Sequence, residues 1–173
     1  MKFELDSATE ILRQTPDMLT QMLSGLSTKW TVTKDDKTDW SPYDVVGHLI
    51  HCEETDWIPR AEVILAQGED RTFPPFDRFA QFEKYRDQSL PELLTEFKRA
   101  RTEGLATLAA WNLTPEKLAL RGVHPDLGEV TLEQLLSTWV VHDLGHIRQI
   151  VVYMAKKYED AVGPWKQFLS ILK

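Results

Sequence analysis

Residues 138–150 read TWVVHDLGHIRQI, and this stretch decides the fold predicted for the whole chain. It belongs to a longer segment, residues 132–157, which contains no proline and whose apolar residues recur at helical spacing. His142 and His146 are four residues apart, about one turn of an α-helix, so the two imidazoles lie on the same face. Such a pair can hold one metal ion when a third ligand comes from elsewhere in the chain.

The residues around the pair distinguish a metal site from an accidental pair, because histidines with this spacing also occur on ordinary helix surfaces. Leu135, Trp139 and Ile150 belong to an apolar stripe, and the two histidines lie at its edge. This position favours a site between helices, and the alternative is a pair of solvent-exposed side chains.

The composition is that of a globular protein. The 173 residues, 42% of them hydrophobic, suit one domain with a single core, and we expect residues 1–173 to form it. No apolar run reaches the roughly 18 residues of a membrane-spanning helix, and the N-terminus lacks the basic-then-apolar order of a secretory signal. A net charge of −7 without a Lys/Arg cluster argues against a nucleic acid or an anionic membrane as partner. The single cysteine, Cys52, excludes an internal disulfide and suits a cytoplasmic location.

Three further long helices are expected, over residues 7–26, 41–68 and 89–108. The first opens with a capping-box pattern at Ser7–Glu10, and Pro16 should kink it or restart it. Ser41 and Ser89 cap the other two, each with a proline in the first turn, and Pro59 should bend the second.

The segments between the long helices show no strand pattern. Residues 71–88 carry many aromatic side chains that need burial, which indicates an ordered crossover with one short helix. Residues 112–129 are rich in turn residues, and Gly163-Pro164 begins a short last helix that continues to Lys173. The sequence therefore predicts an all-α fold, a four-helix bundle with a short C-terminal helix.

His48, His51 and His124 are the candidates for the third metal ligand. At about 100° of rotation per residue, His48 lies at the rim of the apolar stripe of its helix, as His142 and His146 do. His51 lies about 60° further out, toward solvent, and His124 is in a Gly/Pro-rich loop. We therefore predict a three-histidine site with one position open to water, which is the arrangement of a catalytic metal.

Three motifs together resemble the DinB superfamily, in particular its DinB-like and YfiT-like branch. They are residues 40–49, WSPYDVVGHL; the spacing His142-x-x-x-His146-x-x-Gln149-Ile150; and residues 162–165, VGPW. The resemblance implies a four-helix bundle and a divalent metal, commonly nickel or zinc, bound by His48, His142 and His146. It also implies a homodimer in the cytoplasm and a small-molecule substrate. Asp143 departs from the pattern, because a neutral residue is expected there.

The resemblance leaves the reaction open, since some members are thiol S-transferases that use low-molecular-weight thiols and others are described as metal-dependent hydrolases. Three neutral imidazoles leave a metal ion strongly Lewis acidic, which suits both reactions. The alternative is a non-enzymatic bundle that binds a metal or ligand and acts through a protein partner.

Two carboxylates on the helix of His48, Glu53 and Asp56, rotate inward and are candidates for a general base; otherwise they belong to a solvated face. Cys52, one turn after His48, is either a soft ligand or a small buried hydrophobe. The aromatics of residues 73–85 either line a substrate mouth or cover one end of the bundle.

Arg101 and Asp143 are charges at core-facing positions. Neither can be buried alone without a large desolvation cost. We expect a polar seam in which Arg101 pairs with Asp143, Asp56 or Glu53, and in which Asp143 could accept the ring N–H of His48. The alternative is that Arg101 reaches solvent at the bundle end and Asp143 meets water.

Overall fold

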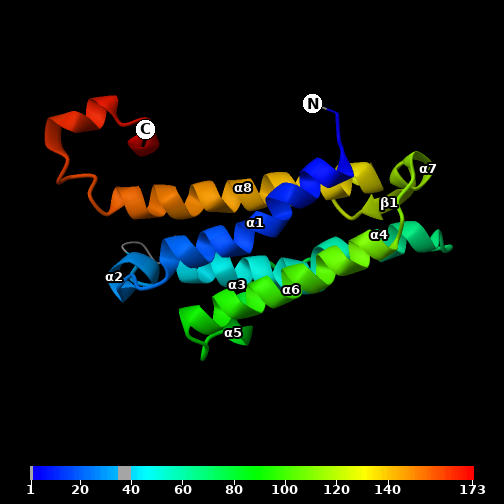
Figure 1. Ribbon diagram of the computed structural model, residues 1–173, viewed down its shortest axis with the longest axis horizontal. Helices are drawn as coiled ribbons and strands as arrows, with labels where there is room; N and C mark the ends of the chain where they lie inside the picture. Colours follow the sequence, from blue (N-terminus) through cyan, green and yellow to red (C-terminus); the bar gives the residue numbers. More distant parts are fainter. Residues whose placement is uncertain (1, 35–39) are drawn as a thin grey trace.

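The computed structural model describes residues 2–34 and 40–173 of the chain. Four long helical stretches run side by side (Figure 1). They are α1 (Leu5–Leu23); α3 (Pro42–Cys52) continued by η1 (Glu53–Trp57) and α4 (Ile58–Ala66); α6 (Leu90–Ala110); and α8 (Leu132–Lys156). Both α1 and α3 contact α6 and α8, which closes the bundle around a common core. The predicted four-helix bundle is confirmed.

Short elements connect the long helices or follow the last of them. They are α2 (Thr28–Thr31), α5 (Ala80–Lys84), α7 (Pro115–Leu118), the strands β1 (Arg121–His124) and β2 (Gly128–Thr131), and the 3-10 helices η2 (Gly163–Phe168) and η3 (Ser170–Leu172). The α5 helix confirms the short helix expected in the crossover. The chain after residue 162 forms two 3-10 helices rather than the single last helix that the sequence predicted.

Side-chain caps fix where three of the long helices begin. Ser41, Ser89 and Thr131 each form a capping box, with the residue three positions later returning a hydrogen bond to the cap. The capping box predicted at Ser7–Glu10 is wrong, because α1 already begins at Leu5. The Ser7 hydroxyl instead donates to the Glu4 carboxylate, 3.3 Å away.

Helix α1 continues through Pro16 as one helix, so the restart that the sequence allowed does not occur. Proline has no N–H to donate, which leaves the carbonyl of Leu12, four residues earlier, without its helical partner. Arg101 Nη1 donates to that carbonyl over 2.7 Å. A buried guanidinium from α6 thus satisfies the group that Pro16 leaves unpaired.

The second long stretch changes its hydrogen bonding before Pro59. Residues Glu53–Trp57 form a π-helix between α3 and α4. The wider π-turn shifts the side chains of this segment around the helix axis relative to a regular α-helix. Asp56, within this turn, lines a cavity, whereas Glu53, at its start, faces α6 and α8.

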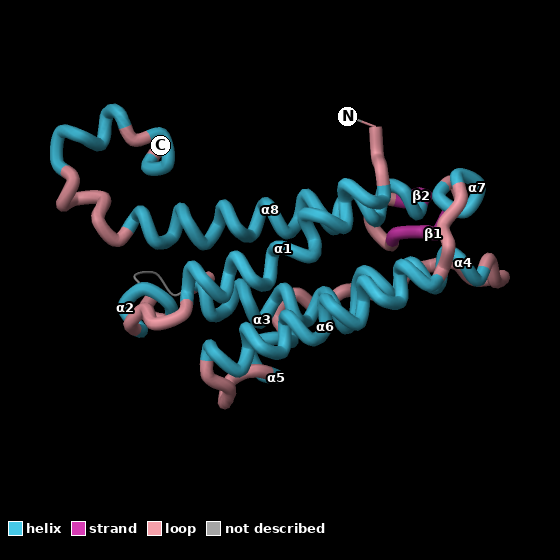
Figure 2. Tube along the Cα trace, in the orientation of Figure 1, coloured by secondary structure: helices cyan, strands magenta, loops and turns pink. Residues whose placement is uncertain are grey.

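A β-hairpin that the sequence analysis missed lies at the end of the bundle near α4 and α7 (Figure 2). Its strands β1 and β2 pair antiparallel, with Gly122 opposite Val130. Gly122 abuts the bundle so closely that a Cβ there would lie 2.5 Å from the ring of Phe73. Strands of four residues are too short for an alternating pattern to stand out, and packing on Phe73 holds this pair in place.

Two apolar clusters fill the bundle. One includes Leu12, Trp57 and Trp139, and the other includes Leu19, Ile50 and Ile150. His142 and His146 lie on α8 between Trp139 and Ile150, which places them where the two clusters meet. Among the described residues, no helix combines the length and the apolarity that crossing a membrane requires.

Candidate metal centre

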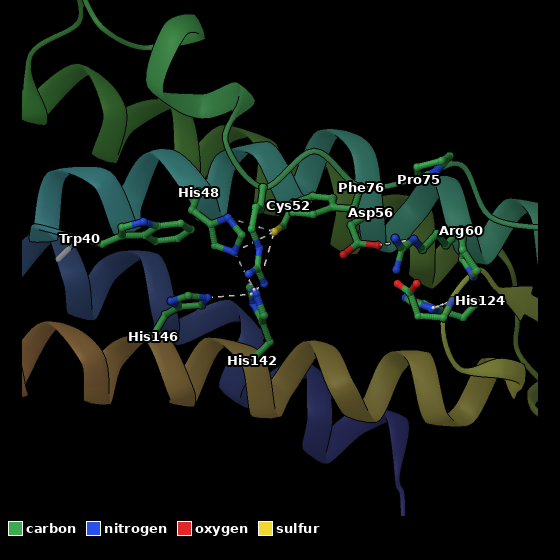
Figure 3. A pocket seen from close by; sticks show the side chains of 13 residues that line it. Trp40, His48, Cys52, Asp56, Arg60, Pro75, Phe76, His124, His142 and His146 are labelled. Carbon is green, nitrogen blue, oxygen red and sulfur yellow. Dashed lines mark hydrogen bonds and ion pairs between the residues drawn. The ribbon is translucent and has the colours of Figure 1, made fainter. Parts of the chain in front are cut away.

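Three imidazoles meet between α3 and α8 (Figure 3). The Nε2 atom of His142 lies 3.2 Å from Nε2 of His48 and 3.1 Å from Nε2 of His146. One nitrogen from each ring falls within 4.8 Å of the others. The structure therefore brings together the three residues that the sequence selected, although one of them is 94 residues away from its neighbour in the cluster.

The hydrogen on one of these rings is fixed by a side chain of α8. His146 Nδ1 lies 2.8 Å from Gln149 Oε1, which can only accept, so Nδ1 carries the hydrogen and Nε2 offers a lone pair. Gln149 was part of the sequence motif, but its role was not predicted. Its spacing of three residues from His146 on a helix is the signal that could have shown it.

Burial keeps the cluster neutral. Burial, with a smaller contribution from the neighbouring His146, lowers the pKa of His48 and of His142 from 6.5 to about 3. Burial lowers the pKa of His146 as well, and the hydrogen bond that His146 donates to Gln149 opposes this shift. Neutral imidazoles are the form that binds a metal ion.

The other two histidines lie apart from the cluster. The sequence placed His51 toward solvent, which is wrong: it is 8% exposed, and its ring packs against Phe76 with the ring centres 5.1 Å apart. Rotation around α3 was correct, but the crossover segment folds over that face and covers it. His124 lies in β1, at the far end of the cavity described next.

A cavity of about 610 Å³ opens onto the three imidazoles. Trp40 forms one wall at the end with the imidazoles, with its ring 4.9 Å from that of His48. Phe76 forms another wall and meets the His48 ring edge-on at 5.8 Å. Phe76 thus confirms that part of the aromatic crossover lines a pocket, whereas Phe73 is a buried core residue.

Cys52 lies beside the imidazoles, with its Sγ 3.5 Å from His48 Nε2 and 4.0 Å from His142 Nε2. Its side chain is 1% exposed. Burial raises the pKa of the thiol, and the carboxylates of Asp56 and Glu53 raise it further. At neutral pH Cys52 is therefore a neutral, buried thiol that borders the cavity, rather than a ready nucleophile.

Behind the imidazoles, the predicted polar seam is present. Arg101 binds both oxygens of Asp143, at 2.7 and 3.0 Å, and Oε1 of Glu53 at 2.8 Å. Trp139 Nε1 donates to the same Glu53 oxygen over 3.0 Å. All four side chains are buried, which excludes the alternative in which Arg101 reaches solvent.

The seam differs from expectation in two details. Both Asp143 oxygens accept from Arg101, so Asp143 does not accept the ring N–H of His48 as the sequence suggested. Glu53 does not line the cavity, which separates it from the position expected of a general base. Asp56 does line the cavity, and its Oδ1 pairs with Arg60 Nε at 2.5 Å rather than with Arg101.

The imidazole cluster fits a metal ion. Ligand nitrogens about 2.0–2.1 Å from a tetrahedral ion are separated by roughly 3.3 Å, close to the two Nε2 distances found here. Lone pairs that face each other at this distance repel unless a proton or a cation lies between them. The rings are held neutral and His146 presents the lone pair of Nε2, so the cluster can bind a cation at this spacing.

Comparison with known proteins identifies the family of the chain. The model of the DinB superfamily matches residues 11–150. No curated protein matches the sequence. Because the family model spans most of the chain, the chain belongs to the DinB superfamily, as the three sequence motifs indicated.

Two solved structures share the fold. YfiT from Bacillus subtilis, described as a probable metal-dependent hydrolase with an unusual four-helix bundle topology, is 23% identical, with a TM-score of 0.75 over 88% of this chain and 86% of that one. TT2238, described as a four-helix bundle protein, is 22% identical, with a TM-score of 0.54 over 83% of this chain and 94% of that one. At these identities the similarity concerns the fold.

Proposed function

We propose that this member of the DinB superfamily is a metal-dependent enzyme whose divalent ion, nickel or zinc, is bound by His48, His142 and His146. The observation that carries the proposal is the set of three neutral imidazoles at the end of an open cavity. An ion held by three imidazoles supplies a Lewis acid that lowers the pKa of a water or a thiol in its remaining position. Hydrolysis and thiol transfer both need such a nucleophile.

The cavity favours an enzyme over a bundle that only stores a metal. A storage or structural site is closed by protein ligands, whereas the space beside these imidazoles is large enough for a small-molecule substrate. Trp40 and Phe76 give that space apolar walls, which exclude water from one side of the substrate.

Other residues of the chain would hold the imidazoles in position and line the cavity. Gln149 orients the His146 ring, and the Arg101 seam fixes α8 against η1 so that His142 keeps its position relative to His48. Asp56 is buried and lines the cavity two helical turns beyond His48, where its carboxylate holds Arg60 in an ion pair. Burial raises the pKa of Asp56, and the charge of Arg60 opposes that shift.

The test is a substrate panel on protein loaded with nickel or zinc. One arm combines low-molecular-weight thiols with an electrophile, and the other offers esters and amides. We expect turnover in one arm, with His142→Ala inactive and His51→Ala active, because His51 lies outside the cluster. Turnover that survives in His142→Ala would refute the proposed site. A metal-loaded protein without activity in either arm favours the non-enzymatic alternative.

A further inference from the structure

The cavity extends well beyond the imidazoles. Past Cys52 it is lined by Asp56, Arg60 and His124, so polar groups gather at the end opposite Trp40 (Figure 3), and Asp126 contacts His124 there. The proposed metal chemistry uses none of the basic groups among them. This end offers a place for the part of a substrate that does not react.

Arg60 is the central group of this polar end. It is 7% exposed, and its guanidinium lies 5.2 Å from the ring centre of Phe73. Its Nε is paired with Asp56, whereas Nη1 and Nη2 donate no hydrogen bond to any residue in the described ranges. A buried guanidinium with two terminal nitrogens available is suited to bidentate binding of a carboxylate.

His124 adds a donor on the opposite wall. The backbone N–H of Asp126 donates to His124 Nδ1 over 3.1 Å, so the hydrogen of the neutral ring is on Nε2. Arg78, which is exposed, also lines the cavity, but its charge acts on His48 and it is not counted at this end. The two nearby carboxylates repel an anion only weakly, because Asp56 is already paired with Arg60 and Asp126 is solvent-exposed.

The helical path sets the length of the molecule that would fit. Asp56 follows His48 by eight residues along α3 and η1, and Arg60 is held beside Asp56 by their ion pair. Eight residues at 1.5 Å each correspond to roughly 12 Å along the helix. A substrate that reaches both ends is therefore elongated.

We propose that the substrate carries a carboxylate, roughly 12 Å from its reacting group, that binds Arg60 and His124 at the far end of the cavity. This inference rests on the proposed function for the position of the reacting group. It makes Arg60 a substrate-binding residue and limits the substrates to elongated molecules with an anionic end.

The experiment uses cobalt-loaded protein and three thiols: 8-mercaptooctanoate, 8-mercaptooctanol and 2-mercaptoethanol. The thiolate-to-cobalt absorption band reports binding at the metal and gives a Kd for each. We expect 8-mercaptooctanoate to bind at least about tenfold more tightly than the alcohol, as a charge-assisted hydrogen bond provides. Equal affinity of the acid and the alcohol would overturn the inference.

The matched variant is Asp56→Asn/Arg60→Gln, which removes both charges of the pair and leaves neither partner buried as a lone ion. We expect it to bind the acid and the alcohol equally. Arg148→Gln on α8, an exposed arginine outside the cavity lining, is the control and keeps the preference. A preference that persists in the double variant would refute the role of Arg60.

Octanoate binding to the metal-free protein, measured by calorimetry, separates this inference from the proposed function. If no thiol produces the cobalt band but octanoate binds and is lost in the double variant, the open metal position is wrong and the carboxylate end stands. If thiols bind with no benefit from the carboxylate and octanoate does not bind, the metal site stands and this inference fails.

Discussion

Replacing Arg101 by Met should destabilise the protein strongly. Arg101 is 1% exposed and holds together α1, α6, η1 and α8 through Leu12, Glu53 and Asp143. Methionine keeps much of the apolar stem and removes the charge. Three acceptors then lose their donor at once.

The size of the effect follows from those acceptors. Glu53 and Asp143 would remain as two buried carboxylates, with side chains 2% and 0% exposed. Removing one partner of a buried ion pair costs about 3–5 kcal/mol, and the Leu12 carbonyl adds about 1–3 kcal/mol for an unsatisfied buried acceptor. Since native domains are stable by only about 5–15 kcal/mol, the variant should be close to unfolding.

Urea denaturation of metal-free protein at pH 7, followed by circular dichroism, measures this change. Arg148→Met makes the same substitution at an exposed position and should change the free energy of unfolding by no more than about 0.5 kcal/mol. The compensated variant Glu53→Gln/Arg101→Met/Asp143→Asn should retain more stability than Arg101→Met. A loss below about 1 kcal/mol in Arg101→Met would refute the reasoning, and a triple variant as unstable as the single one would show that unpaired charge is not the cause.

Three further predictions follow from particular contacts. Metal-free protein should lose stability as the pH falls from 6.5 toward 3, because the unfolded chain protonates His48 and His142 at their ordinary pKa while the folded chain holds both pKa values at about 3. The two buried carboxyl groups of η1 have raised pKa values and change the stability in the opposite direction. The histidine effect is therefore measured as the difference in unfolding free energy between wild type and a His48→Gln/His142→Gln variant in urea titrations. Gly122→Ala should cost about 1–3 kcal/mol by overpacking the hairpin against the ring beneath it, and an unchanged Tm would contradict that close approach. We also propose a homodimer through the exposed apolar face of α8, where Val141 and Leu144 are 67% and 47% exposed; sedimentation should give twice the chain mass for wild type and a single chain for Val141→Glu/Leu144→Glu.

Helical periodicity was enough to predict which three histidines meet, because it places side chains on a particular face of each helix. His142 and His146 share a face by spacing, and His48 occupies the matching rim of its own helix. Arg101 and Asp143 were recognisable for the same reason, as charges at positions that must face the core. Their partners could be narrowed to a few residues, and the structure selected two of the three carboxylates.

Features that depend on which segment of the chain packs over a helix face could not be predicted from the sequence. His51 points where the helix geometry directs it, but Phe76 lies over it. The π-turn at η1 brings Asp56 round to face the cavity, whereas Glu53 faces α6 and α8, and a regular helix was assumed for both. The hairpin and the position of Arg60 could not be predicted either, because each depends on tertiary contacts with Phe73.

The central claim is that His48, His142 and His146 bind one divalent ion. The most direct test is the metal content, by mass spectrometry, of protein purified without a histidine tag, incubated with nickel or zinc and then desalted. We predict one ion per chain in wild type and in His51→Ala, and none in His142→Ala. Stoichiometric metal in His142→Ala, or its loss in His51→Ala, would contradict the account.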